Sequence, residues 1–347
     1  MKTSSEASRK PKRAPRPGTG GITLSDVAKL AGVSAITVSR ALNTPAAVSP
    51  DTLERVKGAI SRSGYVPNLI AGGLASNRSR LVAALVPTIA GPVFLETIQA
   101  LTDALAEAGC QLILGQSGYS GAREDALIDA IVGRRPDGIV LTGILHSPEG
   151  RRRLLASGIP VVETWDLTPT PIDMIVGFSH ENAGAAAADY LYGKGYRKPA
   201  LVTASDHRAT LRRAGFERRF AALGIPSIPV CAVPAPSSLA NGRSGFSDLQ
   251  ARCRDTDVVF CGSDVIAHGV ITEAQARGMV VPRDVAVMGF GDLSFAAHTF
   301  PALTTVRIDG TAIGRQAARF ILDRVEGRDV GPRIRDLGFS IIQRASA

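Results

Sequence analysis

From Leu81 onward the chain alternates short apolar segments with longer helical ones. LVAALVP, DGIVLTG and DVAVMGF have the length and composition of buried strands, and helices are expected near residues 94–108, 122–133 and 149–157. Such alternation is typical of parallel α/β architecture. The series is too long for one compact sheet. A late PALTTVRID strand followed by a helix from Asp309 indicates that the chain crosses between two sheets.

The segment before this region, ITLSDVAKLAGVSAITVSRALN at residues 22–43, predicts two short amphipathic helices joined by a turn at Gly32. Ser25 is expected to cap the first helix and Ser34 the second. The side chains expected to pack inward are Val27, Ala28, Leu30, Ala31, Thr37, Val38 and Ala41. This is the pattern of a DNA-reading helix-turn-helix, although many helical hairpins bind nothing.

The distribution of charge favours the DNA-reading interpretation. Residues 1–78 hold 12 Lys or Arg against four Asp or Glu, a net charge of +8, of the +9 carried by the whole chain. Concentrated basic charge is the footprint of a phosphate-binding surface. The region rich in Lys, Arg, Ser, Pro and Gly at residues 1–21 is expected to be a disordered arm. It is either a solvated tail or a contact along phosphates through Arg13 and Arg16.

Enzymatic and metal-binding functions find no support in the motifs. No G-x-x-x-x-G-K-[ST] loop occurs, and the glycines at 289 and 291 lack the third member of a dinucleotide fingerprint. The cysteines form no C-x-x-C pair and are expected to be buried thiols. The histidines show no ligand spacing and are interpreted as structural or surface residues: His146, His180, His207, His268 and His298. No catalytic residue, metal or cofactor is therefore expected.

Beyond the hairpin the sequence resembles a known family. TLSDVAKLAGVS, TVSRALN, the helix VSPDTLERVKGAI, the GYVPN turn and LIAGGLASNRS are similar to the headpiece and hinge of the LacI/GalR family of bacterial transcriptional regulators. The resemblance continues through VPRDVAVMGFGD and FPALTTVRID. Within that family, VFLETIQ, QSGYSGAREDALID and PIDMIVGFSHENAG are most similar to the gluconate-utilisation repressor branch.

The resemblance implies an α/β fold with an N-terminal helix-turn-helix headpiece and a periplasmic-binding-protein-like core of two parallel-sheet subdomains. The expected boundaries are the arm at residues 1–21, the headpiece at 22–67, a hinge at 68–80, and an effector-binding and dimerisation domain at 81–347. Its subdomains would span about 81–178 with 310–340, and 179–309. The ligand would lie between them, at the carboxyl ends of the strands.

DNA-binding residues follow from their positions in the motif. Ala35, Ile36 and Arg40 are expected to face base edges, where arginine can bond a guanine bidentately. Leu74 matches the hinge leucine that the family inserts into the central base step, although the hinge could also be a linker that never becomes helical. The full set of DNA-binding candidates is Thr23, Ser34, Ala35, Ile36, Thr37, Ser39, Arg40, Asn43, Asn68 and Leu74.

Effector-binding candidates follow from matches to the family and from positions after strands. Arg212 falls at the family's sugar-binding arginine and would supply a counter-charge to an acid; the alternative is a surface arginine. Trp165 could stack on a sugar ring or be buried in a core. Ser263 and Gly291 stand where the lactose repressor has a ligand-binding Asn and Asp. The candidates are Thr88, Phe94, Glu163, Trp165, Asp166, Phe178, Arg212, Ser263, Asp264 and Asp292.

These features predict a bacterial, cytoplasmic, nucleoid-associated regulator with no membrane association. Its expected partners are pseudo-palindromic operator DNA, a small sugar-acid effector of the gluconate type, and a second copy in a homodimer or a higher oligomer. The sign of the response follows the gluconate branch, in which the effector would release DNA. A neutral sugar as effector, or a phosphorylated sugar acid as corepressor, is the alternative.

Overall fold

The computed structural model describes residues 21–66, 78–89, 91–118, 121–145 and 147–347. The chain divides between residues 77 and 78 into two compact units, each described here by itself. The predicted basic arm lies outside the described residues except for Gly21, and the predicted hinge except for residues 78–80.

The first unit contains the predicted hairpin and a third helix. Its helices are α1 (Leu24–Ala31), α2 (Ala35–Asn43) and α3 (Pro50–Ser63), with a 3-10 turn, η1 (Pro45–Ala47), between the last two. They share a small apolar core made of Val27, Ala28, Ala31, Val38, Ala41, Val56 and Ala59. Gly32 takes a left-handed backbone conformation, with φ of 65°, which ends α1 and allows the turn into α2.

The caps of these helices test two local predictions. Ser34 caps α2 as expected, its hydroxyl accepting from the Thr37 amide at 3.1 Å. The prediction of Ser25 as the first cap is wrong, because Thr23, two residues earlier, is the N-cap and forms a capping box with Asp26. Leu30 was also wrongly placed in the core, since 55% of it is exposed.

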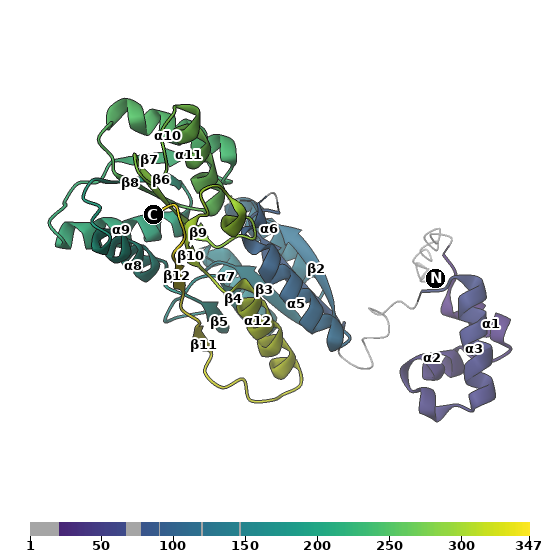
Figure 1. The fold of residues 1–347 in the computed structure, drawn as a ribbon. Helices are drawn as coiled ribbons and strands as arrows, with labels where there is room; N and C mark the ends of the chain where they lie inside the picture. Colours follow the sequence, from purple (N-terminus) through teal and green to yellow (C-terminus); the bar gives the residue numbers. More distant parts are fainter. Residues whose placement is uncertain (1–20, 67–77, 90, 119–120, 146) are drawn as a thin grey trace, which may run out of the picture. The chain divides into compact units, whose positions relative to one another are not determined.

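The second unit contains two six-stranded sheets (Figure 1). The first sheet has the order β11-β5-β4-β3-β1-β2 and the second β12-β10-β9-β8-β6-β7. The strands are β1 (Leu81–Val86), β2 (Gln111–Gln116), β3 (Gly138–Thr142), β4 (Val161–Thr164), β5 (Met174–Gly177), β6 (Pro199–Ala204), β7 (Val230–Val233), β8 (Val258–Cys261), β9 (Ala286–Gly291), β10 (Thr304–Arg307), β11 (Ile334–Asp336) and β12 (Ser340–Ile342). Neighbours are parallel, except that β12 runs antiparallel to β10. The predicted fold class is confirmed, but the short strands β11 and β12 had no recognisable sequence signal.

Helices cover both faces of each sheet. The helices are α5 (Leu95–Glu107), α6 (Gly121–Val132), α7 (Pro148–Ser157), α8 (His180–Gly193), α9 (His207–Ala222), α10 (Leu239–Arg252), α11 (Asp264–Ala276) and α12 (Gly310–Val325), with 3-10 turns η2 (Pro92–Phe94) and η3 (Ala296–His298). The pairs that pack together are α5 with α12, α6 with α7, α8 with α9, and α10 with α11. Central strands are buried on both faces, which explains their continuous apolar runs. Among the described residues, no helix is long and apolar enough to cross a membrane.

The chain passes between the two sheets three times: after β5, after β10, and between β11 and β12 (Figure 1). The last passage carries residues 340–347 to the second sheet, where Ser346 donates to the Val287 carbonyl at 2.6 Å. The carboxyl ends of strands from both sheets surround one cavity, described next.

Candidate functional site

Helix α2 carries most of the predicted base-reading side chains on the outer surface of the first unit. Ile36 is 67% exposed, and Arg40 and Asn43 are exposed as well. The Asn43 amide donates to the Ser39 carbonyl at 3.0 Å and contacts the Ser39 hydroxyl at 3.3 Å, so these two side chains lie together one turn apart. The helix therefore offers an apolar group, a cation and an amide to a partner.

The remaining predicted DNA-binding residues have other positions. Ser34 and Thr37 share the cap of α2, with their hydroxyl oxygens 2.8 Å apart, and Ala35 is half-buried beside them. Thr23 caps α1, where its hydroxyl donates to Asp26 at 2.6 Å. Asn68 and Leu74 lie outside the described residues.

A cavity in the second unit is lined by segments that follow strands of both sheets. The lining residues are Thr88, Gly91, Pro92, Val93, Phe94, Trp165, His180, Asp206, Arg208, Arg212, Pro236, Ser237, Gly262, Ser263, Val265 and Phe290. Thr88 follows β1 and Trp165 follows β4 in the first sheet, whereas Asp206 follows β6 and Ser263 follows β8 in the second. Loops at the carboxyl ends of parallel strands are the usual ligand-binding positions of such sheets.

Arg212 is the most distinctive group in this cavity. It extends from α9, is only 7% exposed, and its guanidinium carbon lies 4.0 Å from the centre of the Phe290 ring. Its terminal nitrogens donate to His180 Nδ1 at 3.0 Å and to the Gly262 carbonyl at 2.9 Å. Burial lowers the pKa of Arg212 to about 10, so the side chain still carries its charge near neutral pH.

The two hydrogen bonds of Arg212 use its terminal nitrogens and leave the Nε donor unused. Its Nε is buried and has no hydrogen-bond partner among the described residues. Both of its hydrogen-bond partners, His180 and the Gly262 carbonyl, are uncharged, and the carboxylates of Asp206 and Asp166 act on it only as nearby charges that raise its pKa. A buried guanidinium in this state is costly unless an anion binds it.

Arg208 extends across the cavity, from helix α9 beside the second sheet to residues at and after the ends of strands of the first sheet. It leaves the same helix as Arg212, lies 4.9 Å from the centre of the Phe94 ring and donates weakly to the Thr142 carbonyl at 3.4 Å. Arg208 and Asp206 also line a neighbouring cavity, together with Glu124, Asp166 and His207. Burial and the nearby Asp125 raise the pKa of Glu124. The neighbouring cavity is therefore richer in carboxyl groups than the first.

Five of the predicted effector-binding residues line the first cavity: Thr88, Phe94, Trp165, Arg212 and Ser263. Asp166 lines only the neighbouring cavity. The other four, Glu163, Phe178, Asp264 and Asp292, line neither cavity. The cavity also contains residues that the sequence analysis did not select, notably His180, Asp206, Arg208 and Phe290. Phe290 lies at the end of the predicted strand DVAVMGF, and His180 lies in PIDMIVGFSHENAG, one of the segments that resemble the gluconate branch, so both had an available signal.

Glu163 and Phe178 are buried behind the cavity rather than in its wall. The Glu163 carboxylate accepts from the backbone amides of Leu145 at 3.2 Å and Ile172 at 2.8 Å, so it ties two loops together. Phe178 is fully buried and packs its ring against Trp165 and His180. Both residues support the lining without reaching it.

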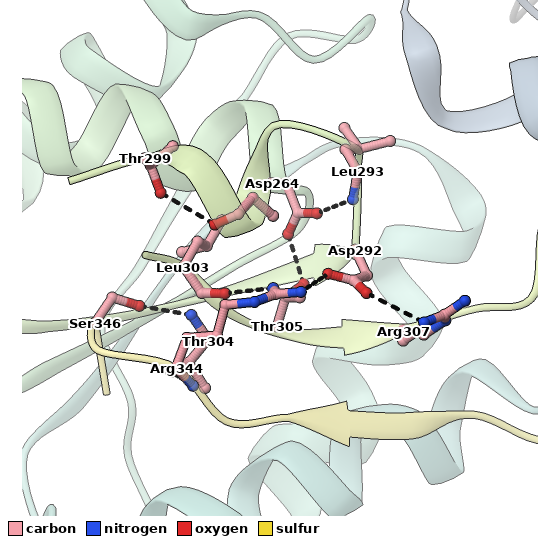
Figure 2. Close-up of polar contacts among 11 residues, drawn as sticks. Asp264, Asp292, Leu293, Thr299, Leu303, Thr304, Thr305, Arg307, Arg344 and Ser346 are labelled. Atoms are coloured by element: carbon pink, nitrogen blue, oxygen red, sulfur yellow. Dashed lines mark hydrogen bonds and ion pairs between the residues drawn. The ribbon is translucent and has the colours of Figure 1, made fainter. Parts of the chain in front are cut away.

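Asp264 and Asp292 form a second polar cluster, on the side of β9 and β10 (Figure 2). Asp264 is fully buried and accepts from the Thr305 hydroxyl at 2.6 Å and the Leu293 amide at 2.7 Å. Asp292 pairs with Arg344 at 2.7 Å and lies 4.0 Å from Arg307. Their carboxylates are occupied in holding the loop after β9, and neither residue lines the cavity.

Comparison with known proteins agrees with this architecture. Residues 23–68 match the model of "Bacterial regulatory proteins, lacI family", and residues 188–347 match the "Periplasmic binding protein-like domain". The HTH-type transcriptional regulator GntR of Pseudomonas aeruginosa is 39% identical over 331 residues, which cover 94% of this chain and 96% of that protein. GntR of Escherichia coli K12 is 30% identical, over 92% and 96% of the two chains.

Solved structures extend the comparison. A LacI-family transcriptional regulator from Silicibacter pomeroyi has a TM-score of 0.88 at 32% identity, covering 94% of this chain and 99% of that one. The Lac repressor dimer bound to operator and the anti-inducer ONPF has a TM-score of 0.81 at 23% identity, covering 94% and 99%, and so shares the fold. The predicted family is thereby confirmed: the chain belongs to the LacI family of bacterial regulatory proteins and is a DNA-binding transcriptional regulator, not an enzyme.

Proposed function

We propose that this regulator is a homodimer that represses genes of sugar-acid uptake or catabolism and leaves its operator when a gluconate-type acid binds the cavity. The observation that carries the proposal is the buried Arg212, with its uncharged partners and its unused Nε donor. A carboxylate can accept from such a guanidinium and neutralise it at the same time. A neutral sugar would bring no charge to Arg212 and would leave only Asp206 and Asp166 to offset it.

The charges around the cavity favour an acid with one negative charge over a phosphorylated one. Arg208 and Arg212 bring two positive charges to the lining, and Asp206 brings one negative charge. The neighbouring cavity adds Glu124 and Asp166, which would repel a phosphate group placed there. A single carboxylate with a polyhydroxyl chain suits this balance, because Asp206 and Ser263 can bond hydroxyl groups.

The relatives supply independent support. Two of the similar proteins are named GntR, and the segments that resemble the gluconate branch include HENAG, which contains the cavity residue His180. The transcriptional regulator CelR, solved with cellobiose, is 30% identical over 94% of this chain, so a neutral sugar is the competing effector class.

Two surfaces support a dimer that reads DNA. The edge strand β2 exposes apolar side chains, with Ile113 and Leu114 each 46% exposed, and such an edge is normally covered by a partner. On α2, Ile36 can contact a thymine methyl and Arg40 a guanine. Two copies would read a pseudo-palindrome in the bacterial cytoplasm, at the nucleoid, with Asn68 and the hinge residue Leu74 contacting the centre of the site.

Calorimetric titration of the purified protein with gluconate, 2-ketogluconate, 6-phosphogluconate and glucose tests the proposal. Binding of gluconate or 2-ketogluconate should weaken about 100-fold or more in Arg212→Ala, because the buried counter-charge is lost. Arg213→Ala is the matched control, since Arg213 pairs with Glu217 away from the cavity lining and its loss should leave affinity unchanged. Binding of glucose alone, or of the phosphorylated acid alone, would contradict the proposed effector class.

A further inference from the structure

A continuous series of hydrogen bonds runs from Arg212 to the opposite subdomain through His180. Arg212 donates to His180 Nδ1, and His180 Nε2 lies 2.8 Å from the Trp165 carbonyl oxygen. The Trp165 indole then donates to the Thr97 hydroxyl at 3.0 Å, and Thr97 donates to the Gly310 carbonyl at 3.0 Å. The series begins on α9 and ends at α5 and the first turn of α12.

The two partners of His180 determine its protonation. A guanidinium can only donate and a carbonyl oxygen can only accept, so Nδ1 must be the acceptor and Nε2 must carry the proton. His180 is therefore the neutral imidazole, in one defined tautomer. Burial at 2% exposure, followed by the charge of Arg212, lowers its pKa well below 6.5, in agreement with this assignment.

Trp165, the next member of the series, has a constrained backbone. Its φ is 64°, in the left-handed region that bulky side chains avoid. Three hydrogen bonds hold this conformation. The indole donates to Thr97, the carbonyl oxygen accepts from His180, and the backbone amide donates to the Val176 carbonyl at 3.2 Å. Gly177 is required beside it, because a Cβ there would lie 2.4 Å from the Asp166 carbonyl oxygen.

We propose that His180 is a positioning residue that orients Arg212 toward the effector. Through its hydrogen bond to the Trp165 carbonyl, His180 also couples effector binding at Arg212 to the conformation of Trp165 in the first-sheet subdomain. By occupying one terminal nitrogen of Arg212, His180 determines which donors remain for the ligand. By donating to the Trp165 carbonyl, it links the ligand's anchor to a strained residue in the opposite wall. This inference rests on the proposed function only for the identity of the effector.

Trp165 is the only tryptophan in the chain, so its fluorescence reports on this series directly, with or without a ligand. His180→Phe keeps a ring but removes both hydrogen bonds, whereas His180→Gln can accept with its oxygen and donate with its nitrogen. His268→Phe is a matched control, since the His268 ring packs against Phe295 at a centroid distance of 5.6 Å and lies outside the cavity lining.

Without ligand, His180→Phe should shift the Trp165 emission and increase its quenching by acrylamide, while His180→Gln and His268→Phe should resemble the wild type. With gluconate, affinity should fall about 10- to 100-fold in His180→Phe and be largely restored in His180→Gln, as expected for the loss of a hydrogen bond to a charged group. Thermal unfolding should show all three variants folded.

The two proposals fail differently. If the wild type binds none of the acids but the ligand-free emission follows the expected pattern, the effector class is wrong and the positioning role stands. If the emission of His180→Phe matches the wild type, or if gluconate binds both equally, the positioning role is overturned. Failure of His180→Gln to restore either readout would also overturn it, because a role in packing alone gives that result.

Discussion

The headpiece and the effector cavity use arginine in opposite ways. Arg40 lies exposed on α2, whereas Arg212 is 7% exposed and held by His180, Gly262 and the Phe290 ring. An exposed arginine keeps its hydration and adapts to a base or a phosphate when DNA arrives. A buried one is oriented in advance and loses its hydration in the folded state, so it selects for an anion. Under the proposed function, the same residue type would read DNA in one unit and a small acid in the other.

Close helix packing beneath Arg212 should make the cavity far more sensitive to added volume than the headpiece. A Cβ at Gly184 on α8 would lie 2.0 Å from the Arg212 carbonyl oxygen. Gly184→Ala should therefore lower the free energy of unfolding by about 3 kcal/mol or more, and should weaken gluconate binding, because α9 must move. Denaturant unfolding and calorimetry measure the two effects.

Gly193→Ala provides the control in the same helix. A Cβ at Gly193 has nothing within 4 Å, so this change should leave stability unchanged or raise it by about 0.5 kcal/mol. Equal behaviour of the two alanine variants would show that the α8–α9 contact does not determine the position of Arg212.

Acid should affect the two units with opposite sign. Burial raises the pKa of Asp264 to about 6, so the folded core binds a proton more readily than the unfolded chain, whose pKa is near 3.8. The contribution of Asp264 to the free energy of unfolding therefore falls as pH rises from about 4 to about 6, by up to about 3 kcal/mol. In the headpiece, hydrogen bonds from Thr23 lower the pKa of Asp26. The contribution of Asp26 to the stability of the headpiece is therefore present above pH 3.8 and is lost as the pH falls below that value.

Urea unfolding followed by Trp165 fluorescence isolates the core in this experiment. In Asp264→Asn the decrease between pH 4 and pH 6 should be absent, and the stability of the variant relative to wild type should rise across that window. Parallel pH curves for the two proteins would show that Asp264 titrates normally.

On the headpiece, the exposed Arg40 should contribute specificity with little effect on folding. Arg40→Ala should weaken operator binding by about 1–3 kcal/mol and relax the preference at one base position. Binding to a randomised operator library measures both effects. Equal weakening on every sequence would mean that Arg40 contacts only phosphate.

The smallest expected effect is at the first cap of the headpiece. Thr23→Ala removes the capping box and should destabilise α1 by about 1 kcal/mol, whereas Ser25→Ala, on the exposed first turn, should change stability by less than about 0.5 kcal/mol. Hydrogen exchange of residues 24–31 measures the difference. Greater loss of protection in Ser25→Ala would restore Ser25 as the cap.

The contrast between the units also explains what could be predicted from the sequence. Helices of the headpiece depend on spacing and caps within a few residues, so their existence and the cap at Ser34 were predictable. The error at Ser25 was local: Thr23 with Asp26 satisfies the same rule two residues earlier. Central strands such as β1, β6 and β8 were predictable because burial on both faces gives apolar runs. The edge strand β2 is largely exposed, and β11 and β12 have only three residues each.

The cavity was less predictable because its members meet through the fold. Arg212 was selected by resemblance, but its partner His180 is 32 residues away, and Gly262 is 50 residues away. Asp264 and Asp292 follow strands exactly where ligand residues are expected, yet their carboxylates turn toward Thr305 and Arg344. Position after a strand indicates which loops surround a cavity; which side chains enter it depends on long-range partners.

The central claim is that an anion on Arg212 controls DNA binding, and one titration tests it most directly. A labelled DNA fragment, selected from a random pool by the wild-type protein, is bound and then titrated with gluconate while its fluorescence anisotropy is followed. Gluconate should release DNA from the wild type, while Arg212→Ala should bind the same fragment equally well and retain it at every gluconate concentration. Retention by the wild type, or equal release from both proteins, would contradict the account.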